Sequence, residues 1–274
     1  MSGSRRISSS AVRAEVLDEP EVAGPDARAS EPAGPADAGW VADGDDLMQR
    51  VARVCATTDW EGHLPAGAAS WRWRFGQAAK RGIDVVLAAA GVIVLAPLLL
   101  LLAVLVKLTS RGPVLYAFTA LGHRGEPFVC YKFRTMTLDA HERKRELLHL
   151  NEMTGPAFKM REDPRVTPLG RILRKSSLDE LPQLWNVLRG EMSLVGPRPP
   201  LPEEFIQYEP WHRGRLAVIP GMTCIWQVLG RNEIRDFDRW MELDRQYIRT
   251  WSLGLDAMLL LKTIPAVFRG TGAY

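Results

Sequence analysis

The sequence predicts an α/β protein that lies on one face of a membrane, and three observations predict it. A run of 22 residues without a charge extends from Val85 to Val106 and has a proline near its middle. Two short segments of aromatic and β-branched residues follow, separated by a glycine-containing turn, which predicts a pair of strands. The rest of the chain alternates amphipathic helical stretches with proline- and glycine-rich turns, as in a small domain with few strands.

Composition excludes several classes of protein. The 274 residues are 46% hydrophobic and 24% charged, which is ordinary globular usage and not that of a wholly disordered, collagenous or coiled-coil chain. The three cysteines (Cys55, Cys130 and Cys224) are far apart and form no CxxC pair, so neither a disulfide framework nor a structural zinc site is expected. A reducing compartment is the simpler interpretation.

Residues 1–70 predict a disordered acidic tail. They carry 6 arginines, no lysine and 12 acidic residues, and the first forty are rich in Ala, Gly, Pro and Ser. No apolar stretch follows Arg5 and Arg6, so a secretory signal peptide is not expected. Within the tail, Asp45–Ala56 has apolar residues at helical spacing and predicts one short helix. We assign the tail no chemistry.

Residues 71–274 form a basic body with 29 basic and 20 acidic residues. Such a charge favours an anionic partner, which is a nucleic acid, an anionic lipid or a phosphorylated metabolite. Composition does not choose among the three. The basic residues gather in clusters the size of a phosphate beside the apolar run, so nucleic acid is not the expected partner.

The apolar run predicts a membrane segment. At about 1.5 Å per residue, its 22 residues are long enough to cross a hydrocarbon core of about 30 Å. Basic residues favour the cytoplasmic side of a membrane, and here they flank the run at both ends: Arg72, Arg74, Lys80 and Arg81 before it, Lys107 and Arg111 after it. We therefore expect residues 71–111 to form an interfacial anchor and a re-entrant helix broken at Pro97, with a straight span as the alternative. Asp84 is expected near the interface, paired with Arg81.

The predicted strands are Val114–Thr119 and Phe128–Phe133. They form a hairpin at the membrane surface, and Lys132 and Arg134 lie near its end.

Three further segments predict helices. Leu138–Met153 is highly charged, and Arg171–Lys175 is short and basic. Trp251–Phe268 is apolar and predicts either a core helix or a helix that lies in the membrane interface, and we favour the interface.

The pair Asp179 and Glu180 is the most informative feature of the body. Ser177 followed by Glu180 fits a capping box, and a first helical turn stabilises carboxylates without any catalysis. However, Arg171, Arg174 and Lys175 precede the pair, and Arg198 follows in a GPRP turn. Two carboxylates among cations suit Mg²⁺ holding a diphosphate, with Asp179 and Glu180 as the metal ligands. A carboxylate can also attack phosphorus.

Seven elements, spread in order over roughly Lys80 to Phe268, resemble one family. They are KRGID, the central Pro97, RGPVLY, YKFRTM, RVTPLGRILRKSSLDELPQLWNVLRGEMSLVGPRP, PGMTCIWQVLGRN and FDRWMELDRQYI. Together they resemble the bacterial sugar transferases of exopolysaccharide type, which are small monotopic phosphoglycosyl transferases. The resemblance implies a re-entrant helix broken at its proline, a catalytic domain over residues 112–274, and a place on the cytoplasmic face of the bacterial inner membrane.

The resemblance also implies a reaction. A sugar 1-phosphate is transferred from a UDP-sugar, UDP-glucose or UDP-galactose, to undecaprenyl phosphate, with release of UMP and a phosphosugar–aspartyl intermediate. Mg²⁺ is the implied cofactor, and membrane lipid is an implied partner. Two alternatives stay open, namely a glycosyltransferase that releases UDP and a membrane-anchored scaffold without activity.

The family's site residues map onto this sequence as follows. Asp179 is the implied nucleophile, and Glu180 is its partner in binding Mg²⁺. The implied substrate- and phosphate-binding residues are Lys132, Arg134, Arg174, Arg198, Arg231 and Asp244. The chain departs from the family at Cys224-Ile225, where Gly-Trp is usual, and we expect the fold to tolerate this change.

Overall fold

The structure is a computed structural model, and it describes residues 44–230 and 234–269. Its α-helices are α2 (Gly44–Ala56), α3 (Trp71–Thr109), α4 (Ala140–Leu147), α5 (Pro168–Lys175), α6 (Leu184–Arg189), α7 (Pro202–Phe205), α8 (Ile225–Leu229), α9 (Phe237–Thr250) and α10 (Leu253–Arg269). Its strands are β1 (Leu115–Leu121), β2 (Pro127–Phe133), β3 (Ser193–Val195) and β4 (Gly221–Thr223). Short 3₁₀ turns lie between them, at Glu61–His63, His123–Gly125, Leu148–Leu150, Leu178–Gln183 and His212–Ala217.

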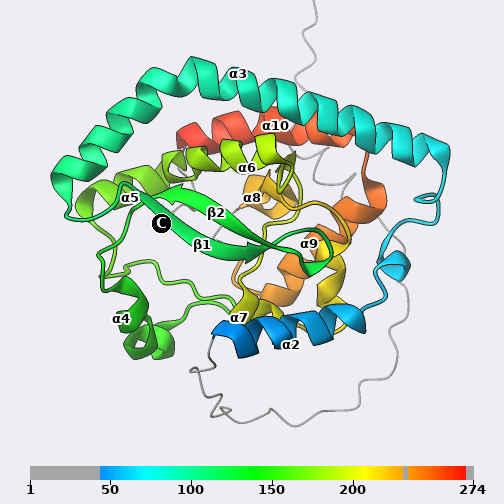
Figure 1. Ribbon diagram of the computed structural model, residues 1–274, viewed down its shortest axis with the longest axis horizontal. Coiled ribbons are helices and arrows are strands. Elements are labelled where there is room, and N and C mark those ends of the chain that lie inside the picture. Colours follow the sequence, from blue (N-terminus) through cyan, green and yellow to red (C-terminus); the bar gives the residue numbers. More distant parts are fainter. Residues whose placement is uncertain (1–43, 231–233, 270–274) are drawn as a thin grey trace, which may run out of the picture. The chain divides into compact units, whose positions relative to one another are not determined.

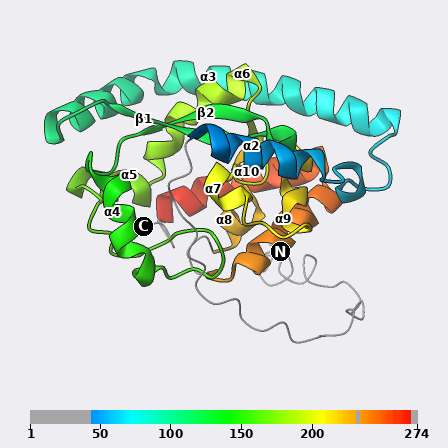
Figure 2. The same ribbon diagram turned by 60° about the horizontal axis from the view of Figure 1, so that its bottom comes forward.

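The structure describes the expected acidic tail only from residue 44 on, where its predicted helix begins. Residues 1–43 lie outside the described residues, whereas α2 coincides with the helix predicted for Asp45–Ala56. Val51 is buried, and α2 packs on α7 and on the turn after β1 (Figure 2). The part of the chain that packs on the domain therefore begins well before residue 71.

The predicted hairpin is confirmed. β1 and β2 pair antiparallel from Leu115 opposite Phe133 to Leu121 opposite Pro127. A second, parallel pair was not predicted from the sequence: β3 lies beside β4, with Ser193 opposite Gly221. Only glycine fits at Gly221, because a Cβ atom there would lie 2.1 Å from the backbone nitrogen of Gly196.

Helix α3 contains the whole apolar run and continues through Pro97. Among the described residues it is the one helix long and apolar enough to cross a membrane. One face packs on the domain through Ala88, Leu102 and Val106. The opposite face exposes large apolar side chains, among them Val86, Ile93, Val94, Leu100 and Leu108. Figure 1 shows α3 as an arch along the domain, with α6 packed against it.

Polar contacts hold the N-terminal part of α3 on the domain. Lys80 Nζ donates to Asp256 Oδ2 in α10 (2.6 Å) and to the carbonyl oxygen of Val195 (2.9 Å). Asp84 accepts hydrogen bonds from Ser193 Oγ (2.7 Å) and from the backbone of Leu194 (3.1 Å). The charged side chains of Lys80 and Asp84, which precede the apolar run, thus have buried hydrogen-bond partners.

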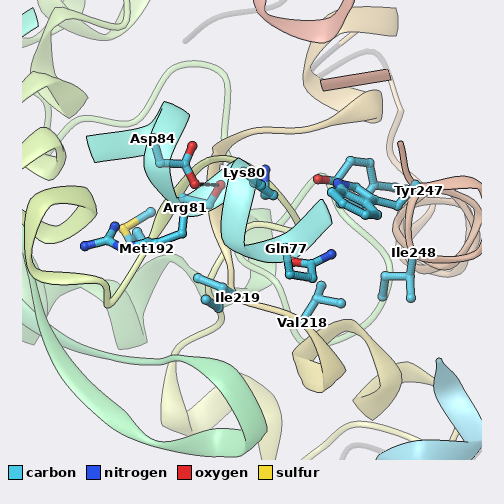
Figure 3. A pocket seen from close by; sticks show the side chains of 11 residues that line it. Gln77, Lys80, Arg81, Asp84, Met192, Val218, Ile219, Tyr247 and Ile248 are labelled. Carbon is cyan, nitrogen blue, oxygen red and sulfur yellow. Dashed lines mark hydrogen bonds between the residues drawn. The ribbon is translucent and has the colours of Figure 1, made fainter. Parts of the chain in front are cut away.

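The expected pairing of Asp84 with Arg81 is wrong. Arg81 instead donates to the carbonyl oxygens of Val187 and Leu188, at the end of α6. Arg81 and Asp84 have different backbone partners because they lie on two sides of α3 that face different segments of the domain. Figure 3 shows these side chains around a small cavity of about 30 Å³, which also borders on Tyr247 and Ile248 of α9.

The C-terminal part of α3 packs on the same domain. Leu102 and Val106 form a small apolar cluster with Phe133 of β2 and Leu173 of α5. A larger core lies around α8 and α9 and includes the stacked pair Trp226 and Trp240. Both ends of α3 therefore contact one body.

Helix α10 has two different faces. Asp256 and Leu259 are buried, whereas Leu261 and Ile264 are exposed. One face belongs to the core, as one of the two sequence-based alternatives required. Placement of the other face in a membrane interface stays a prediction.

Candidate active site

The acidic pair lies in a 3₁₀ turn that follows α5 directly. Ser177 adopts a left-handed backbone conformation (φ 55°), which ends α5 and starts the turn at Leu178. The predicted capping box is wrong, because the Ser177 side chain makes no capping hydrogen bond. Its carbonyl oxygen accepts from the backbone of Glu180 instead, at 3.2 Å. The carboxylates are therefore not explained by helix capping.

Glu180 joins two segments that are distant in the sequence. Lys132 Nζ, in β2, contacts its Oε1 atom at 2.5 Å. Arg198 Nη1, in the GPRP turn after β3, lies 3.4 Å from the same oxygen. The structure thus brings together three of the predicted site residues around one carboxylate.

Asp179 is 7% exposed. Burial raises the pKa of its carboxyl to about 6, with Glu180 acting in the same direction and the charges of Lys132 and Arg174 acting against it. Among the described residues Asp179 forms no ion pair. A buried carboxylate with little compensation is more basic than usual, which suits a nucleophile.

Arg174 is placed by a second set of polar contacts. Its Nε atom donates to Thr135 Oγ1 at 3.0 Å, and its charge interacts with both Asp179 and Asp163. Asp163 forms an ion pair with Arg165, whose Nη2 atom lies 2.6 Å from Asp163 Oδ2. Burial works to raise the pKa of Asp163, but the hydrogen bonds from Arg165 hold it below its usual value. The sequence had not singled out Thr135, Asp163 or Arg165 as parts of the site.

Two predicted residues lie in other surroundings. Arg134 is buried and donates to Ser110 Oγ and to the carbonyl oxygens of Ser110 and Arg111, which ties the end of α3 to β2. Asp244 is 1% exposed and lies 2.8 Å from Arg215 Nη2. Arg231 lies outside the described residues.

The buried pair of Asp244 and Arg215 is electrostatically unusual. Burial raises the pKa of the Asp244 carboxyl to about 6 even though Arg215 acts against the rise. Arg215 also donates from Nη1 to the hydroxyl of Tyr208, at 3.0 Å. These contacts place Asp244 within the core between α9 and the 3₁₀ turn at His212–Ala217.

The donor set at the acidic pair fits Mg²⁺. The described residues contain no group of three His, Cys, Asp or Glu side chains that would hold a metal alone. Mg²⁺ commonly takes one or two carboxylates and completes its shell with water and substrate phosphate. Asp179 and Glu180 would supply those two carboxylates, and the buried charge of Asp179, whose pKa is raised in spite of Lys132 and Arg174, is one that a cation would stabilise.

Comparison with known proteins identifies the family of the chain. The chain matches the family described as "Bacterial sugar transferase" over residues 75–270. It is 43% identical over 203 residues to the exopolysaccharide production protein ExoY of Rhizobium meliloti, which covers 73% of this chain and 89% of that protein. It is 44% identical over 207 residues to the UDP-glucose:undecaprenyl-phosphate glucose-1-phosphate transferase of Caulobacter vibrioides, covering 71% of this chain and 72% of that one.

A third relative is much longer. The galactosyl transferase CpsE of Streptococcus agalactiae is 43% identical over 195 residues, which are 71% of this chain but only 43% of CpsE. The range matched by the family, residues 75–270, includes the acidic pair and the cations Lys132, Arg174 and Arg198. The family match covers most of the described residues. The chain therefore belongs to the bacterial sugar transferase family.

Proposed function

We propose that this protein transfers a hexose 1-phosphate from a UDP-sugar to undecaprenyl phosphate, as a membrane step of exopolysaccharide assembly. The observation that carries the proposal is the arrangement around Glu180, where Lys132 and Arg198 meet beside the buried Asp179. Cations around two carboxylates are what a diphosphate with a divalent cation requires. The names of the relatives from Rhizobium meliloti and Caulobacter vibrioides supply the pathway and the donor class.

In the proposed reaction Asp179 is the nucleophile. Its carboxylate oxygen attacks the β-phosphorus of the UDP-sugar, and the bond from this phosphorus to the bridging oxygen breaks. The electron pair leaves with UMP, and the hexose phosphate remains on Asp179 as an acyl phosphate. An oxygen of undecaprenyl phosphate then attacks the same phosphorus and releases the carboxylate. Two displacements at one centre predict ping-pong kinetics.

The cations of the site have separate roles in this scheme. Arg174 lies where its charge interacts with Asp179, so it is suited to hold the phosphoryl group as that residue attacks. Lys132 and Arg198 fix Glu180 and offset the charge of the diphosphate. Mg²⁺ bound by Asp179 and Glu180 would supply additional positive charge for the phosphate oxygens.

The packing of α3 supports a re-entrant topology. Its N-terminal part is held by Lys80 and Asp84, and its C-terminal part packs on Phe133 and Leu173. A helix that crossed the bilayer would carry one of these ends away from the domain. The exposed apolar face of α3 instead enters one leaflet, and the basic flanks remain on the cytoplasmic side of the inner membrane.

Release of UMP tests the proposal. Detergent-solubilised protein is incubated with Mg²⁺, undecaprenyl phosphate and, in turn, a panel of UDP-sugars that includes UDP-glucose and UDP-galactose. We expect UMP from one of them, dependent on both lipid and Mg²⁺ at steady state. Release of UDP would mean transfer of the sugar alone and would contradict the role of Asp179. An absence of product with every donor would favour a scaffold.

A further inference from the structure

A lysine outside the acidic pair lies in an ordered loop. The loop covers residues 151–161 and is organised by Asn151, whose Oδ1 accepts from the backbone of Lys159 (2.8 Å) and of Met153 (3.2 Å). Asn151 Nδ2 donates to the carbonyl oxygen of Ala157, at 3.0 Å. The backbone of Glu152 donates to the carbonyl oxygen of Lys159, at 2.8 Å. The position of Lys159 is therefore fixed by the loop's own hydrogen bonds.

The Lys159 side chain extends over two tryptophans. Its Nζ atom lies 4.0 Å from the ring centroid of Trp240 and 5.3 Å from that of Trp226. The two rings stack on each other, with centroids 4.2 Å apart and planes 8° from parallel. Both rings are buried, so each has one face on the other ring and little area left for a ligand.

The ammonium of Lys159 lacks an acceptor. Its Nζ atom is buried, and it makes no hydrogen bond in the part of the chain that the structure describes. A cation–π contact compensates only part of the cost of burying an ammonium. The N–H donors of Lys159 thus remain for an acceptor other than the residues that the structure describes.

Arg198 adds a second cation nearby. Burial and, to a smaller extent, the like charge of Arg198 lower the pKa of Lys159 to about 7, and a bound anion would favour the charged form again. Arg198 is also the residue that contacts Glu180. Two repelling cations, one beside the acidic pair and one without an acceptor, cost free energy unless an anion lies between them. This is the charge pattern of a site for an anion with two phosphates.

We infer that Lys159 binds the diphosphate of the UDP-sugar, at the phosphate farther from Asp179. The inference rests on the proposed function, because it takes the donor from there. Arg198 contacts the acidic pair, whereas no described contact joins Lys159 to it, so Lys159 meets the α-phosphate that leaves with UMP. It stabilises the charge that forms on UMP as the bond to the β-phosphorus breaks.

A purely structural role of Lys159 predicts a different effect of its replacement on the stability of the protein. If Lys159 served only as the cation above Trp240, its removal would lower the melting temperature and leave nucleotide affinity unchanged. If it is kept for the diphosphate, replacing the unpaired ammonium by an apolar chain of similar length stabilises the protein while affinity falls.

The test compares Lys159→Met, Lys159→Gln and Lys159→Arg in the full chain. The affinities for UDP, UMP and uridine are measured by titration calorimetry in detergent with Mg²⁺, and melting temperatures are recorded in parallel. The matched control is Arg161→Met, which removes a cation from the same loop. Arg161 lines an open cavity of about 400 Å³ that Lys159 does not line.

We expect both neutral variants to bind UDP roughly 10- to 100-fold more weakly, the usual effect of losing one charge-assisted hydrogen bond. UMP affinity falls as well, uridine affinity is unchanged, and Lys159→Arg recovers most of the loss. Lys159→Gln keeps the test valid if the methionine variant fails to fold. Unchanged UDP affinity in the neutral variants would overturn the inference, as would a loss in Arg161→Met instead.

The results that would refute the proposed reaction differ from those that would refute the role of Lys159. Wild-type protein that binds UDP but releases no UMP from any UDP-sugar refutes the proposed reaction, while a UDP affinity that depends on Lys159 still supports a diphosphate site. Wild-type protein that releases UMP, with variants that bind UDP equally well, refutes only the role of Lys159.

Discussion

Lys132 and Glu180 form an ion pair of 2.5 Å that joins the second strand of the hairpin to the turn carrying the acidic pair. Both side chains are largely shielded from solvent. The pair is therefore a positional constraint as well as a charge contact, because β2 packs directly on this turn. The hairpin that follows α3 thus sets the position of the acidic pair within the domain.

Lys132→Met is expected to lower kcat/KM for the UDP-sugar by roughly 10- to 100-fold. The change removes one charge-assisted hydrogen bond and leaves Glu180 with Arg198 as its nearest cation. Initial rates of UMP release measure it. Lys175→Met is the control, since Lys175 is exposed at the end of α5 and should change the rate less than twofold. Equal effects of the two substitutions would contradict the role of Lys132.

The pH dependence of the reaction follows from Asp179. Its pKa is about 6 in the folded protein without metal, above the usual value of about 4, and in the proposed reaction the ionised form is the nucleophile. The rate of UMP release at limiting Mg²⁺ should therefore fall as the pH decreases through about 6, and a higher Mg²⁺ concentration, which favours the ionised carboxylate, should move this fall to lower pH. A rate that is constant from pH 8 to pH 5 would contradict this assignment.

The same carboxyl gives a stability prediction of defined sign. Between about pH 4 and 6 the folded protein binds more protons at Asp179 than the unfolded chain does, so this group's contribution to the free energy of unfolding falls as the pH rises. Asp179→Asn removes the buried charge and should melt at a higher temperature than wild type at pH 8. The difference should disappear at pH 4. A difference that did not change with pH would have another origin.

The buried ion pair of Lys80 and Asp256 is expected to control stability. Lys80→Met leaves the Asp256 carboxylate buried with Tyr247 Oη and Trp251 Nε1 as its remaining side-chain donors among the described residues, which costs about 3–5 kcal/mol. The melting temperature in detergent should fall markedly, and Asp256→Leu in the same chain should restore part of it. Arg72→Met, at an exposed position of α3, is the control and should have little effect. No loss in Lys80→Met would contradict the packing of α3.

Labelling of single cysteines tests the topology. Arg72→Cys and Arg111→Cys place thiols before and after the apolar run, in a chain with Cys55, Cys130 and Cys224 replaced by serine. In inside-out vesicles a membrane-impermeant reagent should label both positions, and in intact cells neither. Labelling of the two positions from opposite sides would establish a span.

The sequence predicted elements with a strong pattern. The apolar run of α3 is uncharged over 22 residues, and β1 and β2 are rich in aromatic and β-branched residues, so both signals are local in the sequence. The strands β3 and β4 are three residues long, too short for such a signal, and their pairing depends on the close approach of Gly196 and Gly221.

The candidate site was predictable in part. Asp179, Glu180, Lys132 and Arg198 were expected, and the structure brings them together. The capping interpretation failed because it assumed an ordinary helix start, whereas Ser177 is left-handed.

Lys159 was missed because a lysine between prolines and glycines looks like a solvated loop residue. Its place over Trp226 and Trp240 depends on residues some seventy positions away. Asp163 and Arg165 were missed as parts of the site for a similar reason. Their connection to the acidic pair is indirect, because their charges act on Arg174.

Trapping of the covalent intermediate tests the central claim most directly. The protein is mixed with UDP-glucose or UDP-galactose labelled at the β-phosphorus, with Mg²⁺ and without undecaprenyl phosphate, and is then denatured and digested. We predict one label per active protein on the peptide that contains Asp179, with an equal amount of UMP, and no label in Asp179→Asn. Subsequent addition of undecaprenyl phosphate should move the label to lipid. UMP formed only when lipid is present, with no label on the protein at any time, would contradict the account.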